Sequence, residues 1–298
     1  MKKEDIKKFV EENPKLVTMR ESTTYPGLFV LKYKADVFYK GLWNEFLENC
    51  RGTVVDKAFN VISRPFQKIY NFRVEERSPV LSDDVEIQAF RKANGFMATL
   101  TWYNNDILIS TTGSLDSDFI GYTKEMMLTH ASWADWQLVL GNSECRGMSF
   151  MFEVVHPDDP HIIPEKPGMY IIGYRDNTWE STVGHSRAVL NIIASLCKCH
   201  SVECHNTTVG ELVALSKTVN HEGFVFYSDA GDAAKIKSPY YLVSKALARK
   251  KDILSLNKEL VEEEYFPLVE YLNTIKDDFN AKSEQDRLEF IRQWFETK

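Results

Sequence analysis

Short runs of β-forming residues, each ended by turn residues, most constrain what this chain can fold into. They dominate residues 28–179, and two more follow at 223–227 and 233–237. Apolar residues at helical spacing predict helices at 3–13, near 119–129, near 186–197 and near 209–217. Because strands and helices do not alternate regularly, a parallel doubly wound sheet is excluded. The order of elements predicts an α+β fold with antiparallel sheets.

The last part of the chain has a different character. Residues 242–298 contain no Gly and one Pro, with many Leu, Glu, Lys and Asp at helical spacing. This composition predicts a small all-helical C-terminal domain at 242–298, following a main domain at 1–241. Within the main domain, Asn104-Asn105-Asp106 joins two β runs and predicts a hairpin.

Composition excludes several classes of protein. The 298 residues carry a net charge of −7, which excludes a surface coated with basic charge for indiscriminate DNA binding. No run approaches the roughly 20 apolar residues of a membrane span, and the charged N-terminus lacks a signal peptide's apolar core. Five cysteines cannot all pair internally, so we expect an intracellular, cytoplasmic protein with no membrane partner.

A lysine just before a predicted strand is the first candidate for chemistry. Lys92 stands in Arg91-Lys92-Ala93-Asn94-Gly95, where Gly95 admits close approach of the backbone to a ligand. A lysine becomes a nucleophile when its amine loses a proton near neutral pH. The alternative interpretation is an ordinary surface lysine in a turn.

Two glutamates lie at the ends of otherwise apolar β runs. Glu153 follows Phe152, and Glu222 precedes Gly223. Burying a carboxylate is costly unless it is paired or bound to a cation. These positions indicate groups that bind a ribose hydroxyl or a metal ion; the alternative is a strand-end carboxylate that faces water.

Alternation within a strand places Lys235 and Lys237 on one face, roughly 7 Å apart. Like charges side by side repel, so the pair predicts an anion between them, and a polyphosphate is a natural candidate. The paired charge also helps to depress the pKa of a neighbouring nucleophilic lysine. The alternative is an exposed edge strand blunted by lysines.

Taken in order, these motifs resemble the covalent nucleotidyltransferase superfamily, and most closely the bacteriophage RNA ligase 1 family. The resemblance extends over roughly Cys50–Tyr241. Its motifs are Asn49-Cys50-Arg51-Gly52, Ser63-Arg64-Pro65-Phe66-Gln67-Lys68, Lys92-Ala93-Asn94-Gly95, Phe152-Glu153, His161-Ile162-Ile163-Pro164, Ile171-Ile172-Gly173-Tyr174-Arg175, Glu222-Gly223 and Lys235-Ile236-Lys237-Ser238.

The resemblance implies an antiparallel-sheet adenylyltransferase domain and the activity of an ATP-dependent RNA ligase. It implies that ATP forms a lysyl-adenylate, that AMP moves to a 5′-phosphate RNA end, and that a 3′-hydroxyl displaces AMP. ATP and Mg²⁺ or Mn²⁺ are the implied cofactors, and RNA ends, with tRNA repair as one setting, are the implied partner; no obligate protein partner is evident.

The resemblance also implies roles for particular residues. Lys92 would be the nucleophile, assisted by Lys235 and Lys237. Glu222 would bind the metal and Glu153 the ribose, although these two roles could be exchanged. The other implied nucleotide-binding residues are Arg51, Lys68, Tyr70, Gly95 and Gly223; for Tyr70, a core aromatic is an equal alternative.

Two positions depart from the family pattern. Asn94 stands where the phage enzyme has Asp, although fungal and plant tRNA ligases also use Lys-Ala-Asn-Gly. The family carries a basic residue in a Ser-Lys-Gly-Ser segment, whereas Thr111-Thr112-Gly113-Ser114 has Thr112 there. One expected contact to phosphate or nucleotide is therefore missing from this segment.

Several alternatives remain at this stage. A DNA ligase or capping guanylyltransferase usually carries a β-barrel after Lys-x-Lys, whereas this tail is predicted to be helical. A non-catalytic RNA-binding relative would have no use for the nucleophile.

The cluster Cys197, Cys199, His200, Cys204 and His205 raises the possibility of zinc, but its spacing favours free thiols. For Arg64 and Arg175 we expect structural ion pairs.

Overall fold

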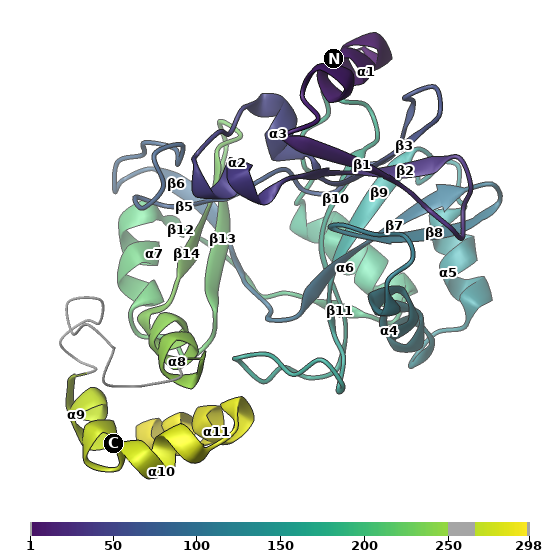
Figure 1. Ribbon diagram of the computed structural model, residues 1–298. Coiled ribbons are helices and arrows are strands. Elements are labelled where there is room, and N and C mark those ends of the chain that lie inside the picture. Colours follow the sequence, from purple (N-terminus) through teal and green to yellow (C-terminus); the bar gives the residue numbers. More distant parts are fainter. Residues whose placement is uncertain (1, 250–265, 297–298) are drawn as a thin grey trace. The chain divides into compact units, whose positions relative to one another are not determined.

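The computed structural model of the chain describes residues 2–249 and 266–296, and it divides into two compact units. Each unit is built from segments that lie far apart in the sequence, and the two are described separately (Figure 1). Unit 1 comprises residues 1–69, 95–160 and 165–203. Unit 2 comprises residues 70–94, 161–164 and 204–298.

Unit 1 begins with a helix and a four-stranded antiparallel meander in the strand order β1-β2-β3-β4. The first helix ends just before Asn13-Pro14, as the sequence predicts, because the residue before a proline disfavours the helical conformation. The elements are α1 (Lys3–Glu12), β1 (Val17–Glu21), β2 (Leu28–Tyr33), α2 (Ala35–Tyr39), α3 (Glu45–Asn49), β3 (Arg51–Asp56) and β4 (Val61–Ser63).

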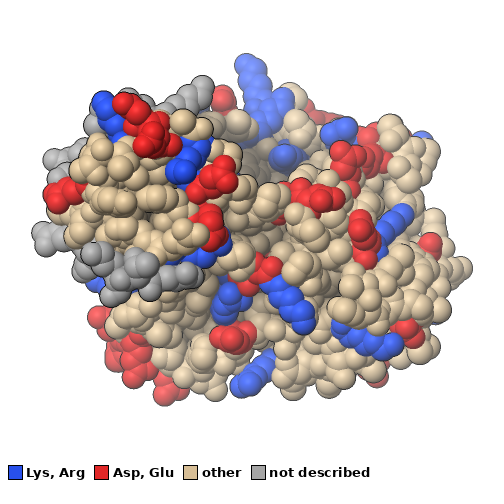
Figure 2. All heavy atoms as spheres, turned by 90° about the horizontal axis from the view of Figure 1, so that it is seen from below, with Lys and Arg blue, Asp and Glu red and all other residues tan. Residues whose placement is uncertain are grey.

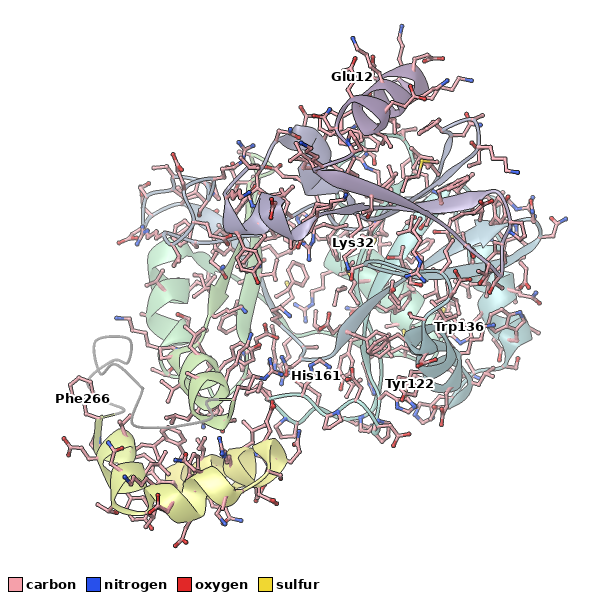
Figure 3. The ribbon with its side chains drawn as sticks, in the orientation of Figure 1. Glu12, Lys32, Tyr122, Trp136, His161 and Phe266 are labelled. Carbon is pink, nitrogen blue, oxygen red and sulfur yellow. The ribbon has the colours of Figure 1, made fainter. Side chains whose placement is uncertain are left out.

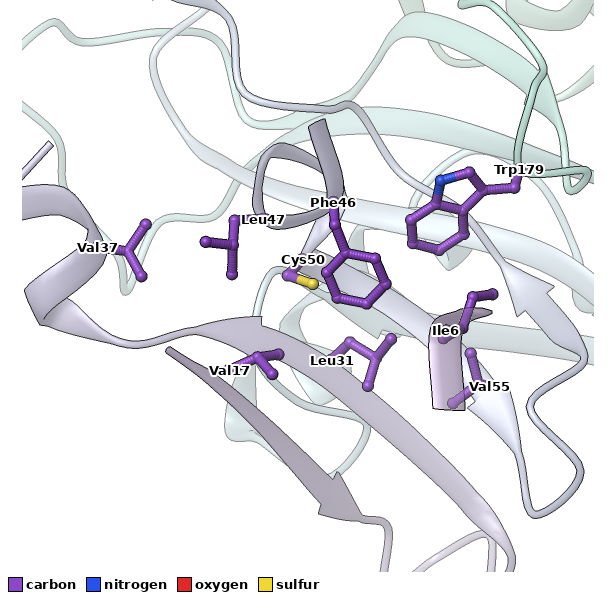
Figure 4. Packing of buried hydrophobic residues seen from close by; sticks show 9 residues of the cluster. All are labelled: Ile6, Val17, Leu31, Val37, Phe46, Leu47, Cys50, Val55 and Trp179. Atoms are coloured by element: carbon purple, nitrogen blue, oxygen red, sulfur yellow. The ribbon is translucent and has the colours of Figure 1, made fainter. Parts of the chain in front are cut away.

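The helices of this segment share a hydrophobic core with the meander, shown in Figure 4. Phe46 of α3 is 3% exposed and lies at its centre. Its ring stacks on Phe9, with centroids 4.0 Å apart, and on Trp179, with centroids 5.2 Å apart. Burial of these aromatic rings therefore fixes the helices on the meander.

A second sheet of unit 1 has the strand order β11-β10-β9-β7-β8. The predicted hairpin is confirmed: Asn104 and Asn105, with φ of 50° and 59°, form the turn between β7 and β8. The elements are β7 (Phe96–Tyr103), β8 (Asp106–Thr111), α4 (Asp118–Leu128), α5 (Trp133–Leu140), β9 (Met148–Val155), β10 (Gly168–Asp176), α6 (Arg187–Leu196) and β11 (His200–Ser201).

Buried hydroxyl groups connect the two sheets of unit 1. Thr101 Oγ1 on β7 donates to Ser63 Oγ on β4 over 2.8 Å, and it lies 2.9 Å from Ser149 Oγ on β9. Because each hydroxyl finds a partner, these polar groups are accommodated without the cost of an unpaired buried donor.

Unit 2 is built on a sheet with the strand order β12-β6-β13-β14-β5. The sheet buries apolar side chains such as Phe224 and Phe226 against α7, which starts with a capping box between Thr208 and Glu211. The elements are β5 (Tyr70–Asn71), β6 (Glu86–Arg91), β12 (Cys204–Thr208), α7 (Val209–Ser216), β13 (Gly223–Ser228) and β14 (Ala233–Lys237).

Helices follow the last strand of unit 2. They are α8 (Pro239–Arg249), α9 (Phe266–Thr274), α10 (Lys276–Ala281) and α11 (Glu284–Glu296). Residues from all four form one buried cluster, which includes Leu247, Leu272 and Phe279. The predicted boundary between 241 and 242 falls within α8, and residues 250–265 lie outside the described part. The division into domains at this boundary stays a prediction.

The predicted fold class is confirmed: the sheets are antiparallel apart from the short pairings β10–β11 and β14–β5, and helices follow the sheets. Acidic and basic side chains are interspersed on the face shown in Figure 2, which agrees with the mixed composition. No helix among the described residues is long and apolar enough to cross a bilayer.

The core around α3 predicts the effect of a single truncation. Phe46→Ala removes a ring with two stacking partners, so we expect the free energy of unfolding to fall by about 3–5 kcal/mol. Urea unfolding followed by tryptophan fluorescence measures this change. Leu138→Ala is the control, because Leu138 is 78% exposed; equal losses in both variants would contradict the assignment of this core.

Candidate active site

The backbone of unit 2 fixes the position of Lys92 at the end of β6. β6 pairs with β13, and the N–H of Lys92 continues this ladder by donating to the carbonyl of Gly223 over 2.9 Å. The Lys92 side chain is 25% exposed, and its Nζ donates to Glu222 Oε2 over 2.9 Å. The interpretation of Lys92 as an ordinary surface lysine is therefore wrong.

Glu222 is the buried centre of a polar cluster in unit 2. Its side chain is 5% exposed, its Oε2 also accepts from Asn94 Nδ2 over 2.6 Å, and its Oε1 lies 3.8 Å from Lys237 Nζ. Burial would raise the pKa of Glu222, but the charge of Lys92, hydrogen bonds from Asn94 and Lys92, and the charge of Lys237 together lower it. Glu222 is thus held as a carboxylate between two cations.

The two contacts of Asn94 explain why asparagine, and not aspartate, suits this position of the motif. Its amide nitrogen donates to Glu222, while its Oδ1 accepts the N–H of Ile163 over 3.1 Å. An aspartate at this position would be ionised beside the Glu222 carboxylate, and it has no hydrogen to donate. The asparagine therefore links two parts of unit 2, a role that the motif comparison alone did not assign.

Gly223 and the lysines of β14 complete the cluster. Gly223 lies opposite Lys237 with φ of +124°, and a Cβ there would approach the carbonyl oxygen of Ile236 to 2.0 Å. Only glycine permits this close approach of β13 and β14. Lys235 and Lys237 lie two residues apart on β14, and both are half-buried.

Burial has the largest effect on the pKa of Lys237. Burial lowers the pKa of Lys237, Glu222 opposes this shift, and the nearby charges of Lys245 and Lys92 lower the pKa further. β14 also pairs with β5 on its other side, at Ala234 and Lys235. The interpretation of β14 as an exposed edge strand is therefore wrong. Tyr70, on β5, is 7% exposed beside β14.

Unit 1 contains the second predicted glutamate. Glu153 on β9 is 8% exposed, and its Oε1 accepts the backbone N–H of Gly95 over 3.0 Å. A Cβ at Gly95 would lie 2.2 Å from the carbonyl oxygen of Val154, so the position requires glycine. Glu153 is not a carboxylate that faces water, and the glycine of the Lys92 motif is its hydrogen-bond donor.

The predicted phosphate contacts Arg51 and Lys68 also belong to unit 1. Arg51 begins β3 and is half-buried. Lys68 is 8% exposed, and its Nζ lies 5.0 Å from the ring centroid of Trp43, a cation–π distance. Its backbone N–H donates to the carbonyl of Glu48 over 2.8 Å.

Arg64 and Arg175 support the chain around Ser181. Arg64 donates to Asn49 Oδ1 over 3.0 Å and to the carbonyl of Thr178, and Arg175 donates to the carbonyls of Pro65 and Ser181. The partners of Arg64 are neutral oxygen atoms, whereas the sequence led us to expect an ion pair.

The cysteine and histidine cluster contains free thiols. Cys197 is buried and Cys199 is half-buried, and neither forms a disulfide. Burial raises the pKa of the Cys199 thiol to about 12. Within the described ranges, no group of three or more His, Cys, Asp or Glu side chains is arranged to hold a metal ion.

Comparisons with known proteins identify the fold. No protein-family model and no curated protein sequence matches the chain. A solved structure from Aquifex aeolicus, named "Putative ATP-dependent DNA ligase", matches 99% of this chain and 79% of its own, with a TM-score of 0.58 and 17% identity. Two forms of an archaeal ATP-dependent RNA ligase match 96% of this chain and 75% of their own, with TM-scores of 0.56 and 0.55 and identities of 14% and 12%.

At these identities the comparison establishes the fold, which is the α+β fold of these ligase structures. No sequence match supports the closer resemblance to the phage family, which stays a prediction. The functional roles of the residues described above also stay predictions.

The Glu222 cluster predicts a pH-dependent contribution to stability. The lowered pKa means that the folded state favours the carboxylate, so this contribution is present above the ordinary value of 4.5 and is lost as the pH falls through the lowered pKa. Glu222→Gln should reduce the free energy of unfolding by about 1–3 kcal/mol at pH 7. Urea unfolding in EDTA across pH 3–8 measures this difference.

The free energies of unfolding of Glu222→Gln and of the unaltered protein should become more similar below pH ~4. Asp229→Asn, at an exposed position of the same unit, is the control and should leave stability nearly unchanged. A difference that stays constant from pH 8 to pH 3 would show that the charge of Glu222 contributes nothing.

Proposed function

We propose that this protein is an ATP-dependent RNA ligase that joins 5′-phosphate and 3′-hydroxyl RNA ends. The observation that carries the proposal is the cluster in unit 2 in which Glu222 accepts from Lys92 and lies 3.8 Å from Lys237. It combines an amine suited to nucleophilic attack, a buried carboxylate and a cation suited to phosphate. The fold shared with the ligase structures supports the same class of reaction.

In the proposed first step, Lys92 Nζ attacks the α-phosphorus of ATP. A nitrogen–phosphorus bond forms, the bond to pyrophosphate breaks, and the amine gives up its protons to solvent. Glu222 holds Lys92 as an ammonium before the reaction, so one proton must leave before attack. Lys235 and Lys237 offset the negative charge that grows on the phosphates and on the departing pyrophosphate.

The donor chemistry at Glu222 fits a hard divalent cation. Mg²⁺ and Mn²⁺ favour oxygen ligands, and Mg²⁺ is commonly held by one or two carboxylates together with substrate phosphates. Glu222 would supply that carboxylate once the substrate brings its phosphates. A bound cation would neutralise phosphate charge and assist the departure of pyrophosphate.

The remaining residues contact the nucleotide and the RNA end in this mechanism. Glu153 accepts from the ribose hydroxyl, Arg51 and Lys68 contact phosphate, and Tyr70 contacts the nucleotide. Gly95 and Gly223 keep the backbone free of side chains at these places. In the second step AMP moves to the 5′-phosphate, and in the third a 3′-hydroxyl displaces it; cleaved tRNA is a substrate of this kind.

The described part of the chain after Lys237 is helical, and this favours an RNA ligase over the members of the superfamily that carry a β-barrel there. A DNA ligase, a capping guanylyltransferase and a non-catalytic RNA-binding protein are the other outcomes of the experiments below. A binding protein would not need Lys92, Glu222 and Lys237 together.

Labelling with α-³²P-ATP tests the first step. With Mg²⁺, we expect radioactivity to stay on the protein through denaturing electrophoresis, because the phosphoramidate bond is covalent. Pyrophosphate should release the label, because it reverses the step and re-forms ATP. Lys92→Ala should reduce the label to background. Lys217→Ala, at an exposed lysine of the same unit, is the matched control and should label normally.

Label that persists in Lys92→Ala would show that another residue is the nucleophile. Absence of label in the unaltered protein would contradict the catalytic assignment and favour a binding protein. Labelling by GTP in preference to ATP would point to a capping enzyme.

The choice of substrate is tested by ligation. We expect single-stranded RNA with a 5′-phosphate and a 3′-hydroxyl to be sealed at least tenfold faster than nicked duplex DNA, with gel electrophoresis of end-labelled strands as the measurement. RNA with a 5′-hydroxyl is the control, since it cannot accept AMP. Faster sealing of nicked DNA would make the protein a DNA ligase.

A further inference from the structure

Two positive side chains of unit 1 face each other across neighbouring strands. Lys32 on β2 lies opposite Arg51 on β3, next to a bulge at which the register skips Gly52. Residues opposite each other in an antiparallel pair point to the same face, and like charges placed there destabilise the sheet. An anion between the two groups would therefore stabilise the arrangement.

The loop after β8 lies against the same pair. A Cβ built on Gly113 would be 2.9 Å from Lys32 Nζ, and a Cβ on Gly52 would be 2.6 Å from the carbonyl oxygen of Thr111. Gly52 also has φ of +106°, a conformation that favours glycine. The two glycines thus bring the Lys32 ammonium, the start of β3 and residues 111–113 together. Lys32 is labelled in Figure 3.

Lys32 has no acidic partner in the part of the chain that the structure describes. In residues 2–249 and 266–296, no carboxylate forms an ion pair with its ammonium, and the side chain is exposed. An ammonium that lies on the same face of a sheet as a guanidinium, and has no ion-paired carboxylate of its own, is suited to bind an anion from outside the chain.

The position of Lys32 also accounts for the unusual sequence of this loop. The resemblance leads us to expect a basic residue within segment 111–114, and the chain has Thr112 instead. Lys32 belongs to a different strand, β2, and its ammonium lies beside Gly113, the residue that follows Thr112. A positive charge is therefore present at the loop, although the local sequence does not contain it.

We propose that Lys32 is a phosphate-binding residue of this protein and acts together with Arg51 above the loop 111–114. The inference rests on the proposed function and adds a residue that determines how the substrate phosphate is held. The ligand is a phosphate group, which either ATP or the 5′ end of an RNA strand can supply. Both share the chemistry that an ammonium and a guanidinium recognise.

Equilibrium binding tests the proposal. The α,β-methylene analogue of ATP cannot lose pyrophosphate, so calorimetry measures its affinity without turnover. A second titration compares 5′-phosphorylated RNA with the same RNA carrying a 5′-hydroxyl. Lys32→Ala should weaken binding of the nucleotide, or remove the advantage of the 5′-phosphate, by roughly tenfold. The affected ligand identifies the source of the phosphate.

Matched variants isolate the charge. Arg20→Ala removes an exposed cation from β1 in the same sheet and should leave both affinities unchanged. Lys32→Arg should retain most of the affinity. Adding Thr112→Lys to Lys32→Ala returns a positive charge to the same loop and should restore binding at least in part.

A purely structural role for Lys32 gives a different result. Because Lys32 faces Arg51, Lys32→Ala should leave the melting temperature unchanged or raise it when no phosphate is present. A lower melting temperature with unchanged affinities would overturn the proposal. Equal weakening of the 5′-phosphate and 5′-hydroxyl RNAs, with nucleotide binding unchanged, would also overturn it.

The proposed function fails separately from this inference. If the unaltered protein forms no lysyl-adenylate, the catalytic proposal is wrong, yet the binding titrations still report on Lys32. If Lys92 is labelled normally while Lys32→Ala binds both ligands as tightly as the unaltered protein, only the phosphate assignment of Lys32 is wrong.

Discussion

The described site depends on the contacts of the buried Glu222 carboxylate with its neighbouring cations and amide. A buried acid is stable only when opposite charge and hydrogen bonds replace its hydration, and Glu222 obtains both from Lys92, Asn94 and Lys237. The same contacts hold the proposed nucleophile in one place before substrate arrives. The stability of this cluster therefore depends on all of its members, because removing one partner weakens the compensation of a buried charge.

Backbone geometry makes this cluster possible. Gly223 lets β13 and β14 approach more closely than any side chain would allow, and Gly95 does the same beside β9 in unit 1. At both places a glutamate lies within the same short stretch of structure, Glu222 beside Gly223 and Glu153 as the acceptor of the Gly95 N–H. The glycines of the two motifs therefore act through close backbone contacts, and flexibility is not their role.

Charge is arranged differently in the two units. In unit 2 two ammonium groups, those of Lys92 and Lys237, flank the buried Glu222 carboxylate, so the three groups keep a net positive charge. In unit 1 Lys32 and Arg51 face each other across two strands, and Lys32 has no acidic partner in the described ranges. Repulsion between like charges gives the arrangement in unit 1 a reason to bind an anion, whereas in unit 2 the carboxylate balances one of the two cations.

The sequence alone determined the class of fold, the strands at 223–227 and 233–237, the hairpin at Asn104-Asn105 and the motifs that contain Lys92, Glu222 and Lys237. Each of these features depends on residues that lie close together in the sequence, as a local pattern or as a short motif. Only the tertiary structure decided that Asn94 bridges Glu222 to Ile163 and that Lys32 lies over Gly113. Both contacts join residues about 70 or more positions apart, and no local periodicity encodes which distant side chain fills a given space.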